Sequence, residues 1–315
     1  TGKSTMIANM VINDMRNGEG VAVVDPHGDL CDVLLDYIPS YRINDLAYLD
    51  PADPEYTFHL NPLEIRNSQY KELIASGIVS IFYKLYHYSW GPRLEYILRN
   101  TILTLLSIPN STLLQIPELL TNESYRRRAV EKMTDSVLKN FWINEFEKMS
   151  PQMKSEAISP ILNKIGQFLS SQTIRRIIEN PVSSIDLEQM MNEGKIILVN
   201  LSQGKLGEDS SALLGAMMIT KLQLAAMNRV HQIEENRKDF YLYVDEFQNF
   251  ATNSFIKILS EARKYRLNLT LANQYVGQID EEVQKAIFGN AGSIVSFSIG
   301  SADARFLAKE FGLKY

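Results

Sequence analysis

The chain has 315 residues, of which 45% are hydrophobic and 22% are charged, with 16 Gly and 11 Pro. This composition excludes disordered, collagen-like and low-complexity proteins, and the length predicts two domains or one large domain with an insertion. The lone cysteine, Cys31, excludes an internal disulfide, and the four histidines have no zinc-binding spacing. We therefore expect a cytosolic protein without a metal cluster.

No apolar run reaches the roughly 20 residues that a membrane-spanning helix needs. The longest candidate, residues 212–227, is interrupted by Lys221. The chain begins at Thr1, inside a motif and without a methionine, so we expect a fragment of a longer protein. Any membrane contact is then expected through a segment outside this chain.

Charge and pattern both set the middle of the chain apart. Residues 66–185 hold 15 basic and 10 acidic side chains, whereas the remainder holds 17 basic and 27 acidic ones. The middle segment has almost only helical patterns, while β-branched or aromatic runs alternate with helices outside it. The strand candidates are residues 21–24, 46–49, 196–201, 240–244, 269–272 and 294–297.

Strands that alternate with helices predict a mostly parallel sheet covered on both faces. We therefore predict an α/β protein in which residues 1–65 and 186–315 form one core. Residues 66–185 are predicted to be an all-α domain inserted into that core.

The first five residues, Thr1-Gly2-Lys3-Ser4-Thr5, resemble the second half of a phosphate-binding P-loop and precede a helical run. In such a loop, backbone N–H groups cradle phosphate, the lysine reaches the β- and γ-phosphates, and the hydroxyl binds Mg²⁺. By itself the short motif also fits an ordinary helix start with a capping serine. The sequence thus predicts Thr1, Gly2, Lys3, Ser4 and Thr5 as nucleotide-binding residues.

A second element fits the same chemistry. Residues 240–244 form an apolar run that ends in Asp245-Glu246, as expected of a buried parallel strand that delivers two carboxylates to its carboxyl end. This resembles a Walker B motif, in which Asp245 binds the Mg²⁺ shell and Glu246 polarises the attacking water. The alternative is a buried strand that stops at ordinary solvated acids.

Two further strand ends supply polar groups at the same edge. Asp25 follows the first strand candidate and Gln274 follows residues 269–272, so both are expected to face the nucleotide crevice. Gln274 could bind the γ-phosphate or orient the lytic water. The alternative for each is a turn or cap residue, and His27 is interpreted as a structural loop residue.

Arg263 follows a helical stripe of Phe255, Ile258, Leu259 and Ala262. A guanidinium on the flank of that stripe can leave the subunit and neutralise a phosphoryl group bound by a neighbour. The alternative is a basic helix end that favours the helix dipole.

Taken together, Asp25-Pro26-His27-Gly28-Asp29, the block 243–247, the block 260–267 and Ala272-Asn273-Gln274 resemble successive motifs of the hexameric DNA-pumping P-loop ATPases. That superfamily includes the FtsK-like chromosome translocases, the HerA-like helicases and the coupling proteins of conjugative type IV secretion. The helical insertion and residues 58–63 are similar to the TraG/TraD-like coupling proteins in particular.

The resemblance implies a RecA-like fold, ATP and Mg²⁺ as cofactors, and ATP hydrolysis coupled to DNA translocation through a homohexameric ring. It assigns Lys3 and Ser4 to nucleotide and Mg²⁺, Asp245 and Glu246 to Walker B, Gln274 to the γ-phosphate, and Arg263 to the neighbouring site. Expected partners are DNA, single-stranded by expectation, and relaxosome or secretion-channel proteins. The expected location is the cytoplasmic face of the bacterial inner membrane.

The insertion carries Arg126-Arg127-Arg128 and Arg175-Arg176, which form either a solvated face or a DNA contact. Its aromatic residues are interpreted as core because many fall at helical spacing. They are Tyr83, Tyr86, Tyr88, Trp90, Tyr96, Phe141, Trp142 and Phe146.

Three alternatives remain beside the coupling protein. Two are enzymes, a HerA-like DNA helicase or translocase and a pilus-assembly ATPase of type IV secretion. The third is a nucleotide-gated scaffold that binds ATP without hydrolysing it, against which Glu246 argues, because a scaffold needs no water-activating carboxylate.

Overall fold

The computed structural model describes residues 2–65, 67–252 and 255–312. The chain divides into two compact units. Residues 1–52 and 186–315 form one, here named the sheet unit, and residues 53–185 form the other, the helical unit.

The sheet unit contains a five-stranded sheet in the order β2-β3-β1-β4-β5, and every neighbouring pair is parallel. The strands are β1 (Gly20–Asp25), β2 (Leu46–Leu49), β3 (Ile196–Asn200), β4 (Phe240–Val244) and β5 (Leu267–Leu271). β1 and β3 are buried at every position, which is why these strands have nearly continuous apolar sequences. The predicted parallel sheet is confirmed.

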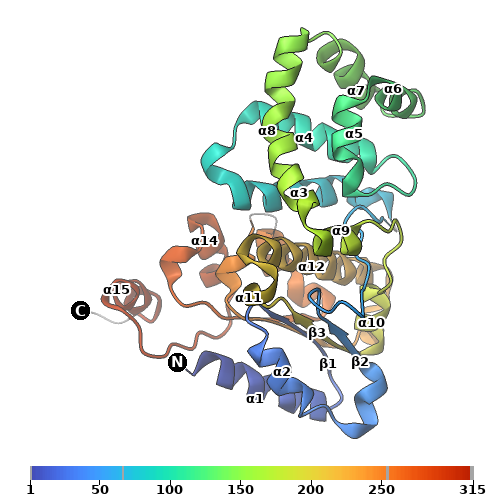
Figure 1. Ribbon diagram of the computed structural model, residues 1–315. Helices are drawn as coiled ribbons and strands as arrows, with labels where there is room; N and C mark the ends of the chain where they lie inside the picture. Colours follow the sequence, from blue (N-terminus) through green and yellow to red (C-terminus); the bar gives the residue numbers. More distant parts are fainter. Residues whose placement is uncertain (1, 66, 253–254, 313–315) are drawn as a thin grey trace. The chain divides into compact units, whose positions relative to one another are not determined.

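Helices cover both faces of this sheet. Val21 and Val23 of β1 pack with Ile196 and Leu198 of β3 against α1 and α2. Figure 1 shows these two helices on one side of the sheet and α12 on the other. The helices of the sheet unit are α1 (Lys3–Arg16), α2 (Asp29–Leu35), α10 (Leu187–Glu193), α11 (Gln203–Leu206), α12 (Glu208–Asn228), α13 (Ile256–Glu261), α14 (Glu281–Asn290) and α15 (Ser301–Glu310).

Residues 208–231, which contain α12, are long and apolar enough to cross a membrane. This differs from the expectation from the sequence, in which Lys221 interrupts the run. However, 83% of the apolar window is buried in the folded protein, as in a core helix. Gly215 shows how tightly α12 packs, because a Cβ added there would lie 2.2 Å from the ring of Phe250.

The strand expected over residues 294–297 is wrong. This stretch is irregular between α14 and α15, and Val295 and Phe297 are 60% and 40% exposed. Its β-branched and aromatic residues favour an extended chain, but a strand also needs a neighbour for its backbone hydrogen bonds. Residues 294–297 are not part of the five-stranded sheet, whose order is β2-β3-β1-β4-β5.

The described residues of the helical unit contain helices and loops but no strand, as expected of an all-α insertion. The helices are α3 (Lys71–Tyr86), α4 (Pro92–Leu105), α5 (Ile116–Thr121), α6 (Glu123–Glu131), α7 (Ser136–Asn140), α8 (Pro151–Ser170) and α9 (Gln172–Ile178). A π-helix over Phe141–Phe146 follows α7 and buries the aromatic centre of the unit. Trp142 is fully buried and its indole N–H donates to Thr104 Oγ1 at 2.8 Å.

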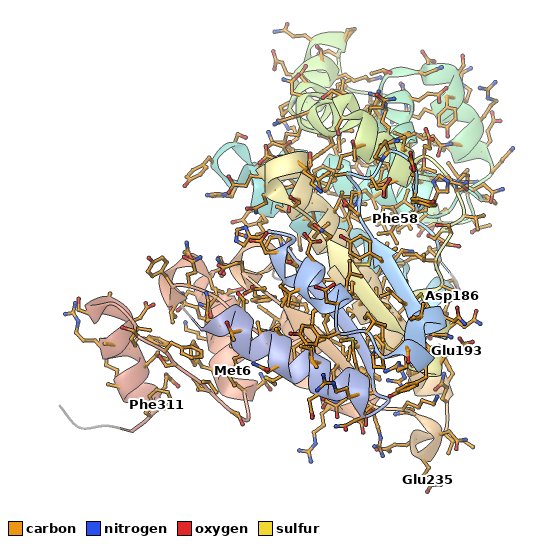
Figure 2. The ribbon with its side chains drawn as sticks, turned by 60° about the horizontal axis from the view of Figure 1, so that its bottom comes forward. Met6, Phe58, Asp186, Glu193, Glu235 and Phe311 are labelled. Atoms are coloured by element: carbon orange, nitrogen blue, oxygen red, sulfur yellow. The ribbon has the colours of Figure 1, made fainter. Side chains whose placement is uncertain are left out.

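The helical unit begins at residue 53, whereas the sequence-based boundary lies between residues 65 and 66. Backbone and side-chain hydrogen bonds explain the difference. Asn61 Nδ2 donates to the carbonyls of Ser111 and Pro181, and the Leu60 N–H donates to the Ile177 carbonyl. The sheet unit resumes at Asp186, whose side chain caps α10; Figure 2 shows Asp186 and Glu193 at the two ends of this helix.

Candidate nucleotide-binding site

The amino end of α1 lies beside the carboxyl end of β4. Gly2 precedes the helix in a left-handed conformation with φ of 102°, and a Cβ there would lie 2.9 Å from Phe297. Glycine is therefore favoured at this position both by the backbone and by the space available. Gly2 gives α1 no side-chain cap, and its first turn contains no acidic residue, so its N–H groups and dipole favour an anion.

Ser4 connects this helix start to β4. Its hydroxyl donates to Asp245 Oδ2 at 2.8 Å, while Asp245 Oδ1 accepts the Glu246 N–H at 2.9 Å. Asp245 directly follows β4 and is 3% exposed. Two potential oxygen ligands for a metal ion, the Ser4 hydroxyl and the Asp245 carboxylate, therefore lie next to each other at the sheet edge.

Glu246 lies at the centre of the cluster. Its Oε1 accepts hydrogen bonds from Lys3 Nζ and Gln274 Nε2, both at 3.1 Å, and its Oε2 accepts from Gln248 Nε2 at 2.6 Å. Lys3 belongs to α1, whereas Gln274 belongs to the loop after β5. Lys3 and Gln274, which were predicted to lie at the same sheet edge as Glu246, therefore meet at its carboxylate.

The side chain of Glu246 has a lowered pKa, and its backbone has an uncommon conformation. Burial by itself would raise the pKa of Glu246, but hydrogen bonds from Gln248, Gln274 and Lys3 and the charge of Lys3 hold that pKa below its usual value. The residue is also left-handed, with φ of 46° and ψ of 49°, which is uncommon for a non-glycine residue. Strained backbone of this kind is concentrated at functional sites.

Asp25 lies beside Asp245, because Val24 of β1 pairs with Val244 of β4. Its carboxylate accepts the N–H groups of His27 at 2.9 Å and Cys31 at 3.1 Å. Burial raises the pKa of Asp25 and the nearby Asp245 raises it further, while these backbone hydrogen bonds lower it. The side chain thus shapes the loop before α2, and a contact with nucleotide stays a prediction.

The remaining P-loop candidates have simpler surroundings. Thr5 is exposed in the first turn of α1, where its carbonyl accepts from Asn9 Nδ2 at 2.9 Å. Thr1 lies outside the described residues.

Arg263 does not join the cluster. It is exposed in the short 3₁₀ turn over Ala262–Tyr265, which precedes β5, whereas Gln274 follows β5. Five residues of strand separate the two edges by about 17 Å at about 3.3 Å per residue. Within one chain the arginine is therefore at the opposite edge of the sheet.

Two buried arginines hold the turn that carries Arg263. Arg229 is fully buried and donates to the carbonyls of Tyr265, at 2.9 Å, and Lys238. Arg237 donates to the Lys264 carbonyl at 2.8 Å. Burial and the charge of Arg237 lower the pKa of Arg229 to about 10. These guanidinium groups thus use backbone carbonyls as their acceptors and fix the path of the chain around Arg263.

Sequence reasoning missed Gln248 and Arg229. Gln248 lies two positions after Glu246, and this short spacing is a signal that could have been used. Arg229 gives no such signal, because its acceptors are carbonyls of residues 9 and 36 positions away.

The oxygen donors fit Mg²⁺ better than a transition metal. Within residues 2–65, 67–252 and 255–312, no group of three or more His, Cys, Asp or Glu side chains could hold a metal. Mg²⁺ instead binds through one or two protein oxygens, several waters and substrate phosphates. Ser4 and Asp245 supply such a pair.

Comparison with known proteins shows what this arrangement is similar to. Residues 239–314, which contain Asp245, Glu246, Arg263 and Gln274, match the family described as the TraM recognition site of TraD and TraG. The chain resembles the TraG/TraD/TrwB-like coupling proteins. This confirms the family resemblance expected from the sequence motifs. No curated protein matches in a sequence search.

Three solved structures resemble this chain in fold. The unbound bacterial conjugative coupling protein TrwBdeltaN70 is 16% identical with a TM-score of 0.59, and the match covers 92% of this chain and 64% of that chain. TrwB in complex with ADP and Mg²⁺ is 16% identical with a TM-score of 0.57, covering 99% and 66%. VirB4 of Thermoanaerobacter pseudethanolicus is 12% identical with a TM-score of 0.65, covering 99% and 78%.

These likenesses show a fold of the RecA-like P-loop type, as predicted. The chain spans about 64% of the length of the first of these coupling-protein structures.

Proposed function

We propose that the chain is the ATP-hydrolysing part of a DNA translocase of the conjugative coupling type. The observation that carries this proposal is the convergence of Lys3 and Ser4 of α1 with Asp245, Glu246 and Gln274 at one sheet edge. The similarity to TrwB, whose structure has been solved with ADP and Mg²⁺, supports a nucleotide and Mg²⁺ at this edge.

Each group has one role in the proposed hydrolysis. The N–H groups at the start of α1 and Lys3 bind the phosphates, and Ser4 and Asp245 hold Mg²⁺. Held by this pair, Mg²⁺ would supply positive charge to the triphosphate. Gln274 orients a water whose oxygen attacks the γ-phosphorus. As that bond forms, the bond to the β,γ-bridging oxygen breaks and Glu246 accepts the proton of the water.

The contact between Lys3 and Glu246 links substrate binding to this chemistry. A bound γ-phosphate competes for the ammonium group, which lies 3.1 Å from Glu246 Oε1. When Lys3 moves to the phosphate, Glu246 loses one of the donors that lower its pKa, and it becomes a stronger base.

Assembly and location follow from the same proposal. The five residues of β5 separate the sheet edge of Arg263 from that of Gln274 by about 17 Å, so Arg263 serves the site of a neighbouring subunit in a homohexameric ring. DNA passes through the ring, and relaxosome or secretion-channel proteins bind the ring. The description of the family matching residues 239–314 as a TraM recognition site supports such a partner. We place the ring at the cytoplasmic face of the bacterial inner membrane.

The decisive experiment measures phosphate release by the purified protein with and without single-stranded DNA. Hydrolysis should rise when DNA is added, and both Lys3→Ala and Glu246→Gln should abolish it. Equal hydrolysis with and without DNA contradicts a DNA translocase. Tight ATP binding without phosphate release favours the nucleotide-gated scaffold instead.

The likeness to VirB4 supports a second candidate, a type IV secretion ATPase that serves pilus assembly. Such an enzyme hydrolyses ATP, but DNA does not stimulate it. For a HerA-like translocase, DNA duplex ends should stimulate ATP hydrolysis, and the protein should work with a nuclease partner.

A further inference from the structure

An aromatic surface lies at the turn between α3 and α4 of the helical unit. We define the aromatic tip as Tyr83, Tyr86, His87, Tyr88 and Trp90, which fall within eight consecutive residues. Tyr88 is 95% exposed and Tyr83 is 43% exposed. Their interpretation as core is therefore wrong, although Phe141, Trp142 and Phe146 are buried as expected.

The rings of the tip are held in place by one another and by the helices beneath. Tyr83 and Trp90 pack edge to face with centroids 5.7 Å apart, and the rings of His87 and Tyr88 lie 3.7 Å apart. The Trp90 indole N–H donates to Glu95 Oε2 at 2.9 Å. The tip is therefore a structured platform with its outermost ring in solvent.

Tyr86 anchors this platform. Its ring packs edge-on against Phe168, with centroids 5.8 Å apart, and its hydroxyl donates to Gln167 Oε1 at 3.1 Å. Lys164 Nζ lies 5.4 Å from the centroid of the Tyr86 ring. The anchoring restricts the motion of the surface before a ligand arrives, which lowers the entropy lost on binding.

The charge around the tip is positive. The segment between Glu72 and Glu95 contains no acidic residue and carries Lys84 and Arg93. Lys164 adds a third positive charge from α8. Glu95 itself pairs with Arg99 at 3.4 Å, which offsets the charge nearest to Trp90.

We propose that the aromatic tip binds single-stranded DNA by stacking bases on its exposed rings while Lys84, Arg93 and Lys164 contact phosphates. Exposed aromatic rings beside cations are the elements with which proteins bind single strands, since every unpaired base offers a π-face. A duplex hides those faces inside its stack. The proposal rests on the proposed function for its biological setting. It adds which surface binds the DNA and that the bound DNA is single-stranded. The binding itself needs no ATP.

The arginine run of the insertion offers a weaker surface. Arg126 is buried, contacts Glu147 at 2.5 Å and donates to the carbonyls of Leu119 and Leu120. Arg127 pairs with Glu123 at 2.7 Å. Arg126 is therefore committed to contacts within the helical unit, and Glu123 partly offsets the charge of Arg127.

Binding of a fluorescein-labelled oligothymidine, followed by anisotropy on the full chain, tests the proposal. We expect Tyr88→Ala to weaken binding about 5- to 10-fold, with a further loss in Tyr83→Ala/Tyr88→Ala, while Tyr88→Trp retains binding. The control is Tyr56→Ala, which removes a 78% exposed tyrosine elsewhere in the helical unit and should change nothing. A duplex of the same length should bind more weakly and be insensitive to Tyr88→Ala.

Tryptophan fluorescence gives a second readout. The chain has two tryptophans, and Trp142 is fully buried, so quenching by oligothymidine should come from Trp90 and disappear in Trp90→Phe. Three phosphate contacts predict a slope of about −2 for log K against log salt, reduced by about 0.7 in Arg93→Ala.

Three results overturn the proposal: no binding of oligothymidine by the full chain, equal binding by wild type and Tyr83→Ala/Tyr88→Ala, or equal loss in Tyr56→Ala. If sedimentation shows that the tip variants change self-association and leave DNA affinity unchanged, the tip is an interface between copies. Failure of the proposed function looks different, because oligothymidine then binds at the tip without stimulating hydrolysis.

Discussion

The Ser4 hydroxyl donates to Asp245 Oδ2 at 2.8 Å, although the two residues are 241 positions apart in the chain. This bond joins the start of α1 to the end of β4. It brings together the two protein oxygens to which we assign Mg²⁺. Its geometry makes Ser4 a direct test of the site.

Ser4→Ala should lower the apparent affinity for Mg²⁺ in ATP hydrolysis by about 10- to 100-fold, because one protein oxygen is lost. Ser4→Thr keeps the hydroxyl and should retain most activity. Titration of Mg²⁺ at fixed ATP measures the effect. An unchanged Mg²⁺ dependence in Ser4→Ala, with the protein folded, removes Ser4 from the metal site.

Gln248 should tune the acidity of Glu246. Gln248→Leu removes a donor at 2.6 Å from Glu246 Oε2, so the pKa of Glu246 should rise and the acid limb of the kcat profile should move to higher pH. Gln278→Leu, at an exposed position, is the control. A profile of Gln248→Leu that overlays wild type contradicts the assignment of that limb to Glu246.

The same lowered pKa affects stability. Because the pKa of Glu246 in the folded chain is below the usual 4.5, its carboxylate adds to the free energy of unfolding, and this contribution is fully present above pH 4.5. The stabilisation is lost as pH falls through the lower folded-state pKa. Gln248→Leu should therefore reduce the free energy of unfolding more at neutral pH than in acid, as measured by urea titration.

Arg263 is tested by mixing subunits. Rings of Arg263→Ala or of Lys3→Ala alone should be inactive, whereas mixed rings should regain some hydrolysis, because a Lys3→Ala subunit supplies its arginine to an intact neighbouring site. Arg229→Met should behave like Arg263→Ala in this assay if the buried guanidinium positions the turn. No recovery in rings whose mixing is confirmed argues against a role in the neighbouring site.

A pair of glycines tests the packing of the two units separately. Gly215→Ala places a methyl group 2.2 Å from the Phe250 ring, so overpacking should exceed the gain in helix propensity and cost about 1–3 kcal/mol in the free energy of unfolding. Gly166, in α8, has nothing within 4 Å of an added Cβ, and Gly166→Ala should stabilise the protein by up to about 1 kcal/mol. Chemical denaturation measures both changes. Equal effects of the two substitutions would contradict the packing of α12 against Phe250.

Much of the sheet and the site chemistry was predictable from local sequence. The five strands that form are four to six residues long. As their apolar sequences predict, β1 is buried throughout and β4, which precedes Asp245, is buried except at Tyr241. Lys3, Glu246 and Gln274 were each recognisable because their residue types follow a helix start or strand end with a defined role in phosphate chemistry. These features depend on neighbours in the chain.

The sequence by itself therefore determined the five strands of the sheet, most of the helices, and the polar side chains that stand at the strand ends. Only the tertiary structure decided that residues 294–297 have no strand partner, that Phe58–Leu63 belong to the helical unit, and that Tyr88 is exposed. It also decided that Gln248 and Lys3 converge on Glu246. The physical reason is range: strand pairing, burial and side-chain hydrogen bonds join groups distant in the chain, and local residue patterns contain little information about those partners.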